Sequence, residues 1–295
     1  MIQNIGDTIT LANGHKMPGF GFGTYKAVDG TDAADSVLAA VGAGYRHIDC
    51  ASFYKNEEMV GRGIQAALSE YGLERDDLFL TSKVWTSDRP YDRAIESCRQ
   101  SMIDLGVKYL DLLLIHWPSD DHQDSDWVNM NLETWRAFTD LYKAGEVKAI
   151  GVSNFWPEHL EALMETEVPP MVDQIEYHPG YMQNGVTGYC DEDVVGYCRA
   201  HGIAVEAWSP LGRAKVLENE TLRRIAEEYG RSVSQICLRW EVQHEIVPLP
   251  KSVHENRILE NANVFDFELE ESDMRSIDEL PVIGFSGHTP KDVPW

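Results

Sequence analysis

The chain has 295 residues, of which 43% are hydrophobic, 10% aromatic and 25% charged. This is the composition of a folded protein with a sizeable core, and it excludes the disordered class, in which hydrophobic residues are scarce. The 49 acidic and 25 basic residues give a formal net charge of -24, which opposes binding to nucleic acid or to an anionic membrane.

The first expected element is a β-hairpin over residues 8–18, because Asn13-Gly14 lies between two short flanks and is a strong short-range hairpin signal. After it, short apolar runs alternate with amphipathic stretches. The expected strands cover residues 19–24, 45–49, 78–85, 110–116, 147–153, 171–177, 203–208 and 246–250. The expected helices cover residues 32–43, 56–69, 91–105, 132–144, 158–164, 191–201 and 220–242, the last divided in two at Gly230-Arg231-Ser232.

Eight strand–helix units with no linker between them predict an α/β fold, a single (β/α)8 TIM barrel that forms one domain over residues 1–295, with the N-terminal hairpin capping its bottom. A doubly wound sheet is the alternative, and it should carry G-x-G-x-x-G after its first strand. Here Gly19, Gly21 and Gly23 alternate, and Thr24 stands where the third glycine is needed. The alternation fits a strand packed closely on one side better than a phosphate loop.

Three polar residues stand where successive apolar strands end: Asp49, Lys83 and His116, and Tyr54 follows the first of them by five positions. In a (β/α)8 barrel the carboxyl ends of the strands meet at one rim, so these four side chains should converge. An acid, a phenol, an ammonium and an imidazole can deliver a proton to a carbonyl oxygen while a hydride adds to the carbon. The sequence therefore predicts a carbonyl-reducing site.

The chain resembles the aldo-keto reductases over nearly its whole length. The resemblance rests on several stretches in the right order: Gly44-Tyr45-Arg46-His47-Ile48-Asp49, Tyr54, Asn56-Glu57, Thr81-Ser82-Lys83-Val84-Trp85, Asp111-Leu112-Leu113-Leu114-Ile115-His116-Trp117-Pro118, Gly151-Val152-Ser153-Asn154-Phe155, Gln174-Ile175-Glu176-Tyr177-His178-Pro179 and Pro250-Lys251-Ser252-Val253. It implies that Asp49, Tyr54, Lys83 and His116 are the catalytic tetrad of an NADP-dependent oxidoreductase. The short-looped bacterial members that it most resembles include 2,5-diketo-gluconate, glyoxal and aldehyde reductases.

Electrostatics suggest how this tetrad would work. Tyr54 is the natural proton donor, and a cation favours its phenolate. At ~4 Å and an effective dielectric of ~20, Lys83 would contribute about 4 kcal/mol, or roughly three pK units as an upper value. We therefore expect the pKa of Tyr54 to lie close to neutral pH, with Asp49 fixing Lys83 and a neutral His116 orienting the carbonyl.

The resemblance also implies a nicotinamide cofactor. Ser153, Asn154 and Gln174 would bind its carboxamide, and Trp208 stands where many relatives have a tyrosine that stacks on the ring. Lys251, Ser252 and Arg257 match the residues with which the family binds the adenosine 2′-phosphate, so NADPH is expected to be preferred over NADH. The remaining expected cofactor contacts are Gly23, Thr24, Asp49, Ser209, Leu211, Val253, Glu260 and Asn261.

One departure from the longer-looped relatives follows the seventh barrel strand. The segment 212–217 is short, whereas mammalian members fold a longer segment over the pyrophosphate. We expect faster cofactor release, with Arg213 and Lys215 supplying positive charge in its place.

Four aromatic residues, Tyr25, Phe53, Trp85 and Trp117, follow strand ends and are expected to line an apolar substrate pocket. Its width should depend on three loops, residues 118–130, the short loop at 212–217 and the tail 281–295. Asp120, Asp121, Asp124 and Asp126 predict a solvated acidic loop. No histidine spacing of the H-E-x-x-H kind is present, so no metal site is expected, and a hydrolase on the same barrel is remote.

Five cysteines, an odd number without a C-x-x-C pair, favour reduced thiols over a disulfide framework: Cys50, Cys98, Cys190, Cys198 and Cys237.

No signal peptide and no run of ~18 apolar residues are present. We expect a soluble, cytoplasmic monomer with a small-molecule carbonyl substrate, and no membrane or nucleic-acid partner. The alternative is an NADP(H)-binding regulatory module like the subunits of some potassium channels, with little turnover.

Overall fold

The structure, a computed structural model, describes residues 2–27, 32–120, 122, 124–185 and 192–291. Cys190, Asp121 and the last residues of the predicted tail, 292–295, lie outside the described residues.

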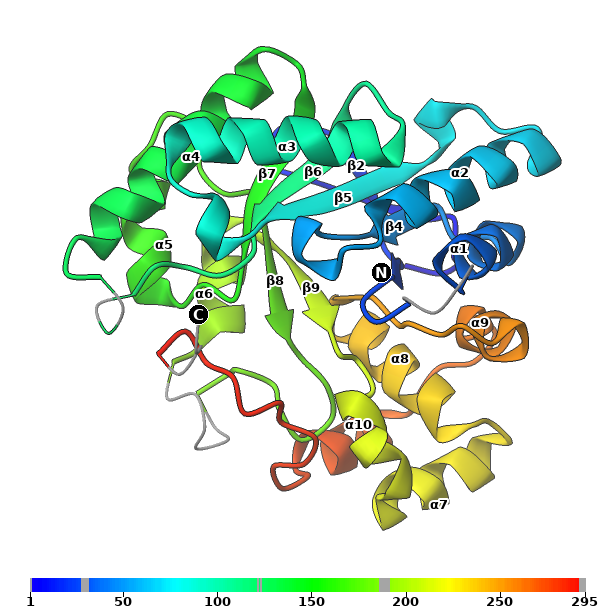
Figure 1. The fold of residues 1–295 in the computed structure, drawn as a ribbon. Helices are drawn as coiled ribbons and strands as arrows, with labels where there is room; N and C mark the ends of the chain where they lie inside the picture. The colour runs from blue at the N-terminus through cyan, green and yellow to red at the C-terminus, as the bar shows by residue number, and fades with distance from the viewer. Residues whose placement is uncertain (1, 28–31, 121, 123, 186–191, 292–295) are drawn as a thin grey trace.

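Eight parallel strands form one sheet that curves into a barrel, as predicted (Figure 1). Each strand pairs with its neighbour in chain order, from the first to the eighth. Their bounds are β3 (Phe22–Gly23), β4 (His47–Asp49), β5 (Phe79–Val84), β6 (Leu110–Ile115), β7 (Val147–Ser153), β8 (Val172–Glu176), β9 (Ala204–Trp208) and β10 (Val247–Pro248). Both β5 and β6 are buried along their whole length, as expected of strands covered on both faces.

The barrel closes between its first and last strands. The backbone N–H groups of Gly21 and Gly23 donate to the carbonyl oxygens of Pro248 and Pro250, each at 3.0 Å. A Cβ on Gly21 would lie 2.5 Å from the side chain of Leu249, so any larger residue there would collide with the closing strand. The alternating glycines therefore serve close packing, as the sequence indicated, and the doubly wound alternative is wrong.

The N-terminal hairpin, β1 (Thr8–Thr10) and β2 (Lys16–Pro18), is antiparallel, with Gly14 at φ 86° in its turn. It covers the amino ends of the strands. Asn13 donates to the carbonyl of Lys148 near the start of β7 at 2.9 Å, and His15 stacks on Phe79 at the start of β5. The hairpin thus closes the bottom of the barrel, opposite the rim where the predicted site residues lie.

The helices cover the outside of the sheet (Figure 1). They are α1 (Asp32–Gly42), α2 (Glu57–Tyr71), α3 (Tyr91–Leu105), α4 (Trp127–Lys143), α5 (Pro157–Met164), α6 (Val194–His201), α7 (Glu220–Tyr229), α8 (Val233–Gln243), α9 (Glu255–Ala262) and α10 (Glu271–Asp278). The predicted division between α7 and α8 is confirmed, with Gly230 at φ 62° ending α7 and Ser232 capping α8. The short helices α9 and α10 were not predicted from the sequence.

The start of α4 was placed too late. The helix begins at Trp127, whereas the prediction began at residue 132 and assigned 127–130 to a loop. Polar Asn131 obscured the apolar periodicity, but its side chain is buried and holds the preceding loop, accepting from Ser119 N at 2.8 Å and donating to Ser119 O at 3.0 Å.

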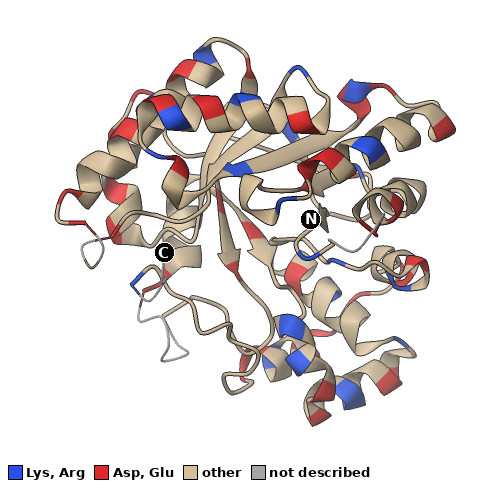
Figure 2. Ribbon diagram, in the orientation of Figure 1, with Lys and Arg blue, Asp and Glu red and all other residues tan. Residues whose placement is uncertain are grey.

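Acidic residues are spread over the outer helices and loops, interspersed with fewer basic ones (Figure 2). Among the described helices, none combines the length and the apolar character that crossing a bilayer requires.

Buried Glu241 on α8 makes the stability of the protein depend on pH. Within the described residues neither of its carboxyl oxygens has a hydrogen-bond partner, and burial raises the pKa of Glu241 well above its ordinary value. Between pH ~4.5, where the unfolded chain ionises, and its raised folded pKa, the group keeps its proton only in the folded protein. Stability from this group is therefore full below that pH and declines as pH rises towards the folded pKa.

We expect Glu241→Gln to stabilise the protein more at pH 8 than at pH 5, because the amide cannot ionise on unfolding. The difference from wild type should grow by up to about 1.4 kcal/mol per pH unit within this window. Urea unfolding at several pH values measures it, with Glu96→Gln on the exposed face of α3 as control. A constant difference between pH 5 and pH 8 would contradict the assignment.

Candidate active site

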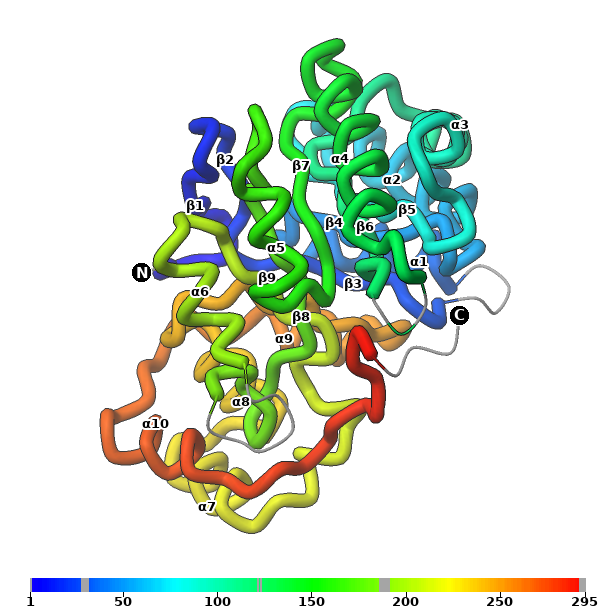
Figure 3. Tube along the Cα trace, turned by 90° about the vertical axis from the view of Figure 1, so that its left-hand side faces the viewer, coloured from blue at the N-terminus to red at the C-terminus, as the bar shows by residue number. Residues whose placement is uncertain are grey.

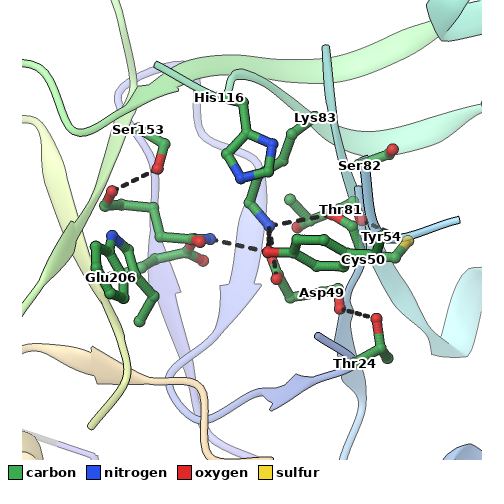
Figure 4. A network of polar contacts seen from close by, with 12 residues as sticks. Thr24, Asp49, Cys50, Tyr54, Thr81, Ser82, Lys83, His116, Ser153 and Glu206 are labelled. Carbon is green, nitrogen blue, oxygen red and sulfur yellow. Dashed lines mark hydrogen bonds and ion pairs between the residues drawn. The ribbon is translucent and has the colours of Figure 1, made fainter. Parts of the chain in front are cut away.

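The four side chains of the predicted tetrad, three from successive strand ends and Tyr54 from the loop after β4, meet at the carboxyl rim of the barrel (Figure 4). The ammonium of Lys83, at the end of β5, lies 2.6 and 2.7 Å from the two carboxylate oxygens of Asp49, which ends β4. It also donates to the hydroxyl of Tyr54, in the 3-10 helix Ser52–Tyr54, at 3.1 Å. The ring of His116 stands over the tyrosine at 5.6 Å between centroids. The structure therefore brings all four together.

The ammonium of Lys83 remains charged although its side chain is fully buried. Burial opposes the charge, but Asp49 and Tyr54 outweigh it, so the pKa of Lys83 is raised above its ordinary value. The carbonyl oxygen of Cys50 is a further acceptor, at 3.1 Å. A lysine held by acceptors from three residues has little freedom to move away from the tyrosine.

The expected pKa of Tyr54 is wrong. Burial of the phenol is the largest influence and raises the pKa, whereas Lys83 lowers it, and the negative charge of Asp49 raises it again. The result is a pKa of about 12, above the ordinary value instead of near neutrality. Sequence reasoning included the cation but had no measure of the desolvation that opposes it.

His116 is neutral, as predicted. Burial and the nearby charge of Lys83 both hold the pKa of His116 well below its usual range. Its Nδ1 is buried and has no hydrogen-bond partner among the described residues. Edge-to-face packing by Trp85, at 4.9 Å between centroids, fixes the plane of the ring. A neutral imidazole at this place can donate a hydrogen bond to a carbonyl oxygen without competing for the proton of Tyr54.

The predicted aromatic wall is present around the tetrad. Phe53 stacks on Trp85 with ring centroids 3.8 Å apart, and Tyr25 lies 4.9 Å from the ring of Tyr54. Both pairs and Trp117 line the cavity described next.

A cavity of about 850 Å³ extends from the tetrad along the carboxyl rim. Most of the predicted cofactor and pocket residues line it: Gly23, Tyr25, Asp49, Phe53, Tyr54, Trp85, His116, Trp117, Ser153, Asn154, Gln174, Trp208, Ser209, Leu211, Arg213, Lys251, Ser252, Arg257, Glu260 and Asn261. Thr24, Lys83, Lys215 and Val253 are not among the lining residues. Thr24 is buried and its hydroxyl donates to the carbonyl of Asp49 at 2.9 Å, so it holds the end of β4. Lys215 is exposed and does not line the cavity, so the structure does not support its expected contribution of positive charge there.

The expected carboxamide ligands form one connected group. Asn154 donates to the carbonyl of His116 and to the hydroxyl of Ser153, each at 3.0 Å, and its Oδ1 accepts the indole N–H of Trp208 at 2.7 Å. Ser153 in turn donates to the carbonyl of Gln174 at 2.7 Å. Asn154 has a positive φ of 63°, so the surrounding hydrogen bonds hold its backbone in a conformation that few residues adopt. Trp208 also lines the cavity.

Four basic residues line the cavity. Lys26, Arg213, Lys251 and Arg257 all line it, although the protein is strongly acidic. Lys251 and Ser252 precede α9, and Arg257 lies in its first turn. The amino end of a helix presents unpaired N–H groups and favours anions. This donor set fits a phosphate, and the helix that completes it is one that the sequence analysis missed.

The loop after β9 is short, as predicted, and folds as a 3-10 turn over Gly212–Glu218. Arg213 and Ala214 have positive φ values of 53° and 69°. The tail after α10 runs past this loop at the carboxyl end of the barrel (Figure 3). There Gly284 approaches so closely that a Cβ on it would lie 2.9 Å from the Cα of Gly212.

The tail is fixed to the end of β8. Glu176 accepts the backbone N–H of Ser286 at 2.9 Å and its hydroxyl at 2.6 Å. His288, two residues further on, lines the cavity. The tail therefore contributes to the pocket wall, as expected for part of residues 281–295.

One set of potential metal ligands lies outside the cavity. Oxygen or nitrogen atoms of Asp120, Glu158 and His159 lie within 4.8 Å of one another. However, Nδ1 of His159 accepts the N–H of Trp156 at 3.1 Å, so its Nε2 carries the proton and donates to Asp120 at 2.9 Å. That nitrogen has no lone pair for an ion. Asp120 is thus a buried structural residue, which corrects its assignment to a solvated loop.

Comparison with known proteins decides the family. A model of the aldo/keto reductase family matches residues 19–281. A glyoxal reductase of Bacillus subtilis is 46% identical over 281 residues, which are 95% of each chain. The crystal structure of an aldo-keto reductase from a Medee basin deep-sea metagenome library superposes with a TM-score of 0.85 at 39% identity, covering 97% of this chain and 98% of that one. A Bombyx mori aldo-keto reductase in complex with NADP gives 0.83 at 32% identity, with 94% and 93% covered.

The chain belongs to the aldo/keto reductase family.

Sequence reasoning missed one polar layer of this aldo/keto reductase. Beneath the tetrad, inside the barrel, lie Glu206 of β9 and His47 of β4, both fully buried. A signal for Glu206 was available, because it is a charged residue between Val205 and Ala207 in an otherwise apolar strand. Lys26 and His288 in the cavity wall were also missed, since each depends on a loop conformation.

The raised pKa of Tyr54 predicts a specific pH dependence. We expect kcat/KM for carbonyl reduction to show no loss from deprotonation of Tyr54 between pH 6 and pH 9, because the phenol keeps its proton until pH approaches about 12. The rate profile should be combined with ultraviolet titration of tyrosinate in wild type minus Tyr54→Phe, which isolates this phenol. A titration centred near pH 7 would show that the cation outweighs burial after all.

Proposed function

We propose that this protein reduces aldehydes and ketones to alcohols with NADPH, and that Tyr54 is the general acid. The observation that carries the proposal is the position of the Tyr54 hydroxyl, which lies on the cavity wall at 3.1 Å from an ammonium that is itself clamped by Asp49. NADPH, when bound, supplies the hydride that adds to the carbonyl carbon.

Residues of the protein stabilise and protonate the carbonyl oxygen of the substrate. Negative charge grows on the carbonyl oxygen as the carbon is reduced, and hydrogen-bond donors that already point at this atom lower the barrier. Tyr54 and neutral His116 are such donors on adjoining walls of the cavity. The proton of Tyr54 then passes to the oxygen, and the phenolate that remains faces the ammonium of Lys83. A proton from water restores the phenol.

The basic residues that line the cavity support NADPH as the cofactor. A 2′-phosphate carries two negative charges and would be repelled by a protein of net charge -24 without local cations. Lys251 and Arg257 supply these charges next to the amino end of α9. Glu260 and Asn261, further along the same helix, are suited to the adenine, and the connected group of Ser153, Asn154 and Gln174 to the carboxamide.

The aromatic wall of Tyr25, Phe53, Trp85 and Trp117 supports a small carbonyl substrate with apolar or aromatic groups. The glyoxal reductase relative adds dicarbonyl compounds to the class that should be tried first. A panel of dicarbonyls, aromatic aldehydes, sugars and steroids, followed by loss of NADPH absorbance, would rank them. We further propose that residues 1–295 act as one domain, as a monomer in the cytoplasm.

A regulatory module without turnover finds no support. All four tetrad side chains are present and in contact, and the named relatives include reductases and a morphine 6-dehydrogenase.

Tyr54→Phe tests the general acid directly. The variant keeps the ring packing but lacks the proton, so we expect kcat for aldehyde reduction to fall by about 10²-fold to 10⁴-fold. The Kd for NADPH should change less than about threefold, because the cofactor is held by other residues. Tyr91→Phe, a surface tyrosine on α3, is the control. Near-normal turnover by the Tyr54 variant would exclude this residue as the acid.

Arg257→Ala tests the phosphate grip. We expect KM for NADPH to rise about 10-fold to 100-fold, the range for losing a charge-assisted hydrogen bond, while KM for NADH stays nearly constant. Arg275→Ala on exposed α10 is the matched control. Equal KM values for the two cofactors in the wild type, or a lower one for NADH, would overturn the assignment.

A further inference from the structure

The carboxyl group of Glu206 lies inside the barrel, one layer below the cavity. In the register of the sheet it pairs with Gln174 on the neighbouring strand, so both side chains point to the barrel interior. Its Oε2 accepts a hydrogen bond from Nε2 of Gln174 at 2.9 Å. Gln174 lines the cavity, and Glu206 is fully buried beneath it.

The same amide nitrogen has a second acceptor. Nε2 of Gln174 also donates to Oδ2 of Asp49 at 2.9 Å. An amide NH₂ has two N–H donors, and here both are engaged by carboxyl oxygens from different strands. The amide oxygen of Gln174 must therefore face away from both carboxyl groups. Turning the amide over would set that oxygen against two acceptors and break both hydrogen bonds.

The two acceptors differ in their other hydrogen-bond partners. Asp49 also binds the ammonium of Lys83. Among the described residues Glu206 has Gln174 as its hydrogen-bond partner, and its Oε1 has none. His47 lies 3.7 Å away, but burial lowers the pKa of His47 to about 3, so the two do not form an ion pair.

Glu206 needs no charge for this task. Burial and the neighbouring charge of Asp49 raise the pKa of Glu206 to about 8, against the lowering effects of Gln174 and Lys83. At neutral pH the group is therefore mostly a carboxylic acid, whose carbonyl oxygen still accepts the N–H of Gln174. A neutral acceptor also adds no second negative charge next to Asp49.

We propose that Glu206 is a positioning residue that fixes the amide of Gln174 with its oxygen towards the nicotinamide carboxamide. It thereby selects the face of the nicotinamide ring that meets the carbonyl. This inference rests on the proposed function, because it assigns Gln174 to the carboxamide. Rotating the ring by half a turn would move the carboxamide away from Gln174 and present the opposite face. A loosened Gln174 should permit that second orientation.

The test compares Glu206→Leu, which removes the acceptor, with Glu206→Gln, which keeps a neutral acceptor oxygen. Calorimetry gives the Kd for NADP⁺, and NADPH with deuterium on one or the other face of C4 gives the face from which hydride is transferred. For Glu206→Leu we expect Kd to rise about tenfold and a measurable fraction of transfer from the wrong face. For Glu206→Gln we expect a Kd within about threefold of wild type and unchanged facial selectivity.

Glu241→Leu is the matched control, because Glu241 is also a fully buried carboxyl group but lies on α8 away from the cavity lining. It should leave Kd and facial selectivity unchanged. If Glu206→Leu does not fold, Glu206→Met keeps the side-chain length and takes its place. In a Gln174→Leu background the Glu206 substitution should have no further effect on Kd.

Wild-type Kd and facial selectivity in the Glu206→Leu or Glu206→Met variant would overturn the proposal, and so would equal impairment in Glu206→Gln. Failure of the proposed function gives a different pattern. Tyr54→Phe would then retain turnover, or the wild type would show no reduction, while the binding comparison could still be made.

Discussion

The active site depends on one buried ion pair, between Lys83 and Asp49. Removing two charges from water is costly, and the pair is tolerable because the ammonium has acceptors from three residues and the carboxylate is held by both Lys83 and Gln174. The pair also influences the other two tetrad residues. Tyr54 is set by its hydrogen bond to the ammonium, and His116 is neutral partly because the same charge lies close by.

Burial and charge act in opposite directions on the tetrad, and burial is stronger at the phenol. In the mechanism proposed above, the raised pKa of Tyr54 would keep the phenol protonated until a carbonyl develops negative charge beside it. If the pKa of Tyr54 were near 7, about half of the molecules would lack the phenol proton at neutral pH. In this arrangement the cation stabilises the product of proton transfer, the phenolate, more than it prepares the acid.

The sequence predicted the barrel, the hairpin and the tetrad because each depends on local signals. Asn13-Gly14 marks its own turn, and polar residues at the ends of apolar strands must meet at one rim. It could not supply the desolvation of Tyr54, which is a property of the assembled site. The polar layer of His47 and Glu206 was overlooked because strand periodicity does not tell the inside of a barrel from its outside. Helix α9 was missed although α5 and α6, which were predicted, are no longer than its eight residues.

The closure between Gly21 and Pro248 has a consequence for synthesis of the chain. The whole tetrad is encoded before residue 117, whereas the residues proposed to bind the 2′-phosphate lie after residue 250, beyond the strand that closes the barrel. A ribosome must therefore make nearly all of the protein before the first strand finds its second neighbour. A chain interrupted earlier would contain the four tetrad residues but lack the basic residues Lys251 and Arg257 of the cavity wall and the strand that closes the barrel.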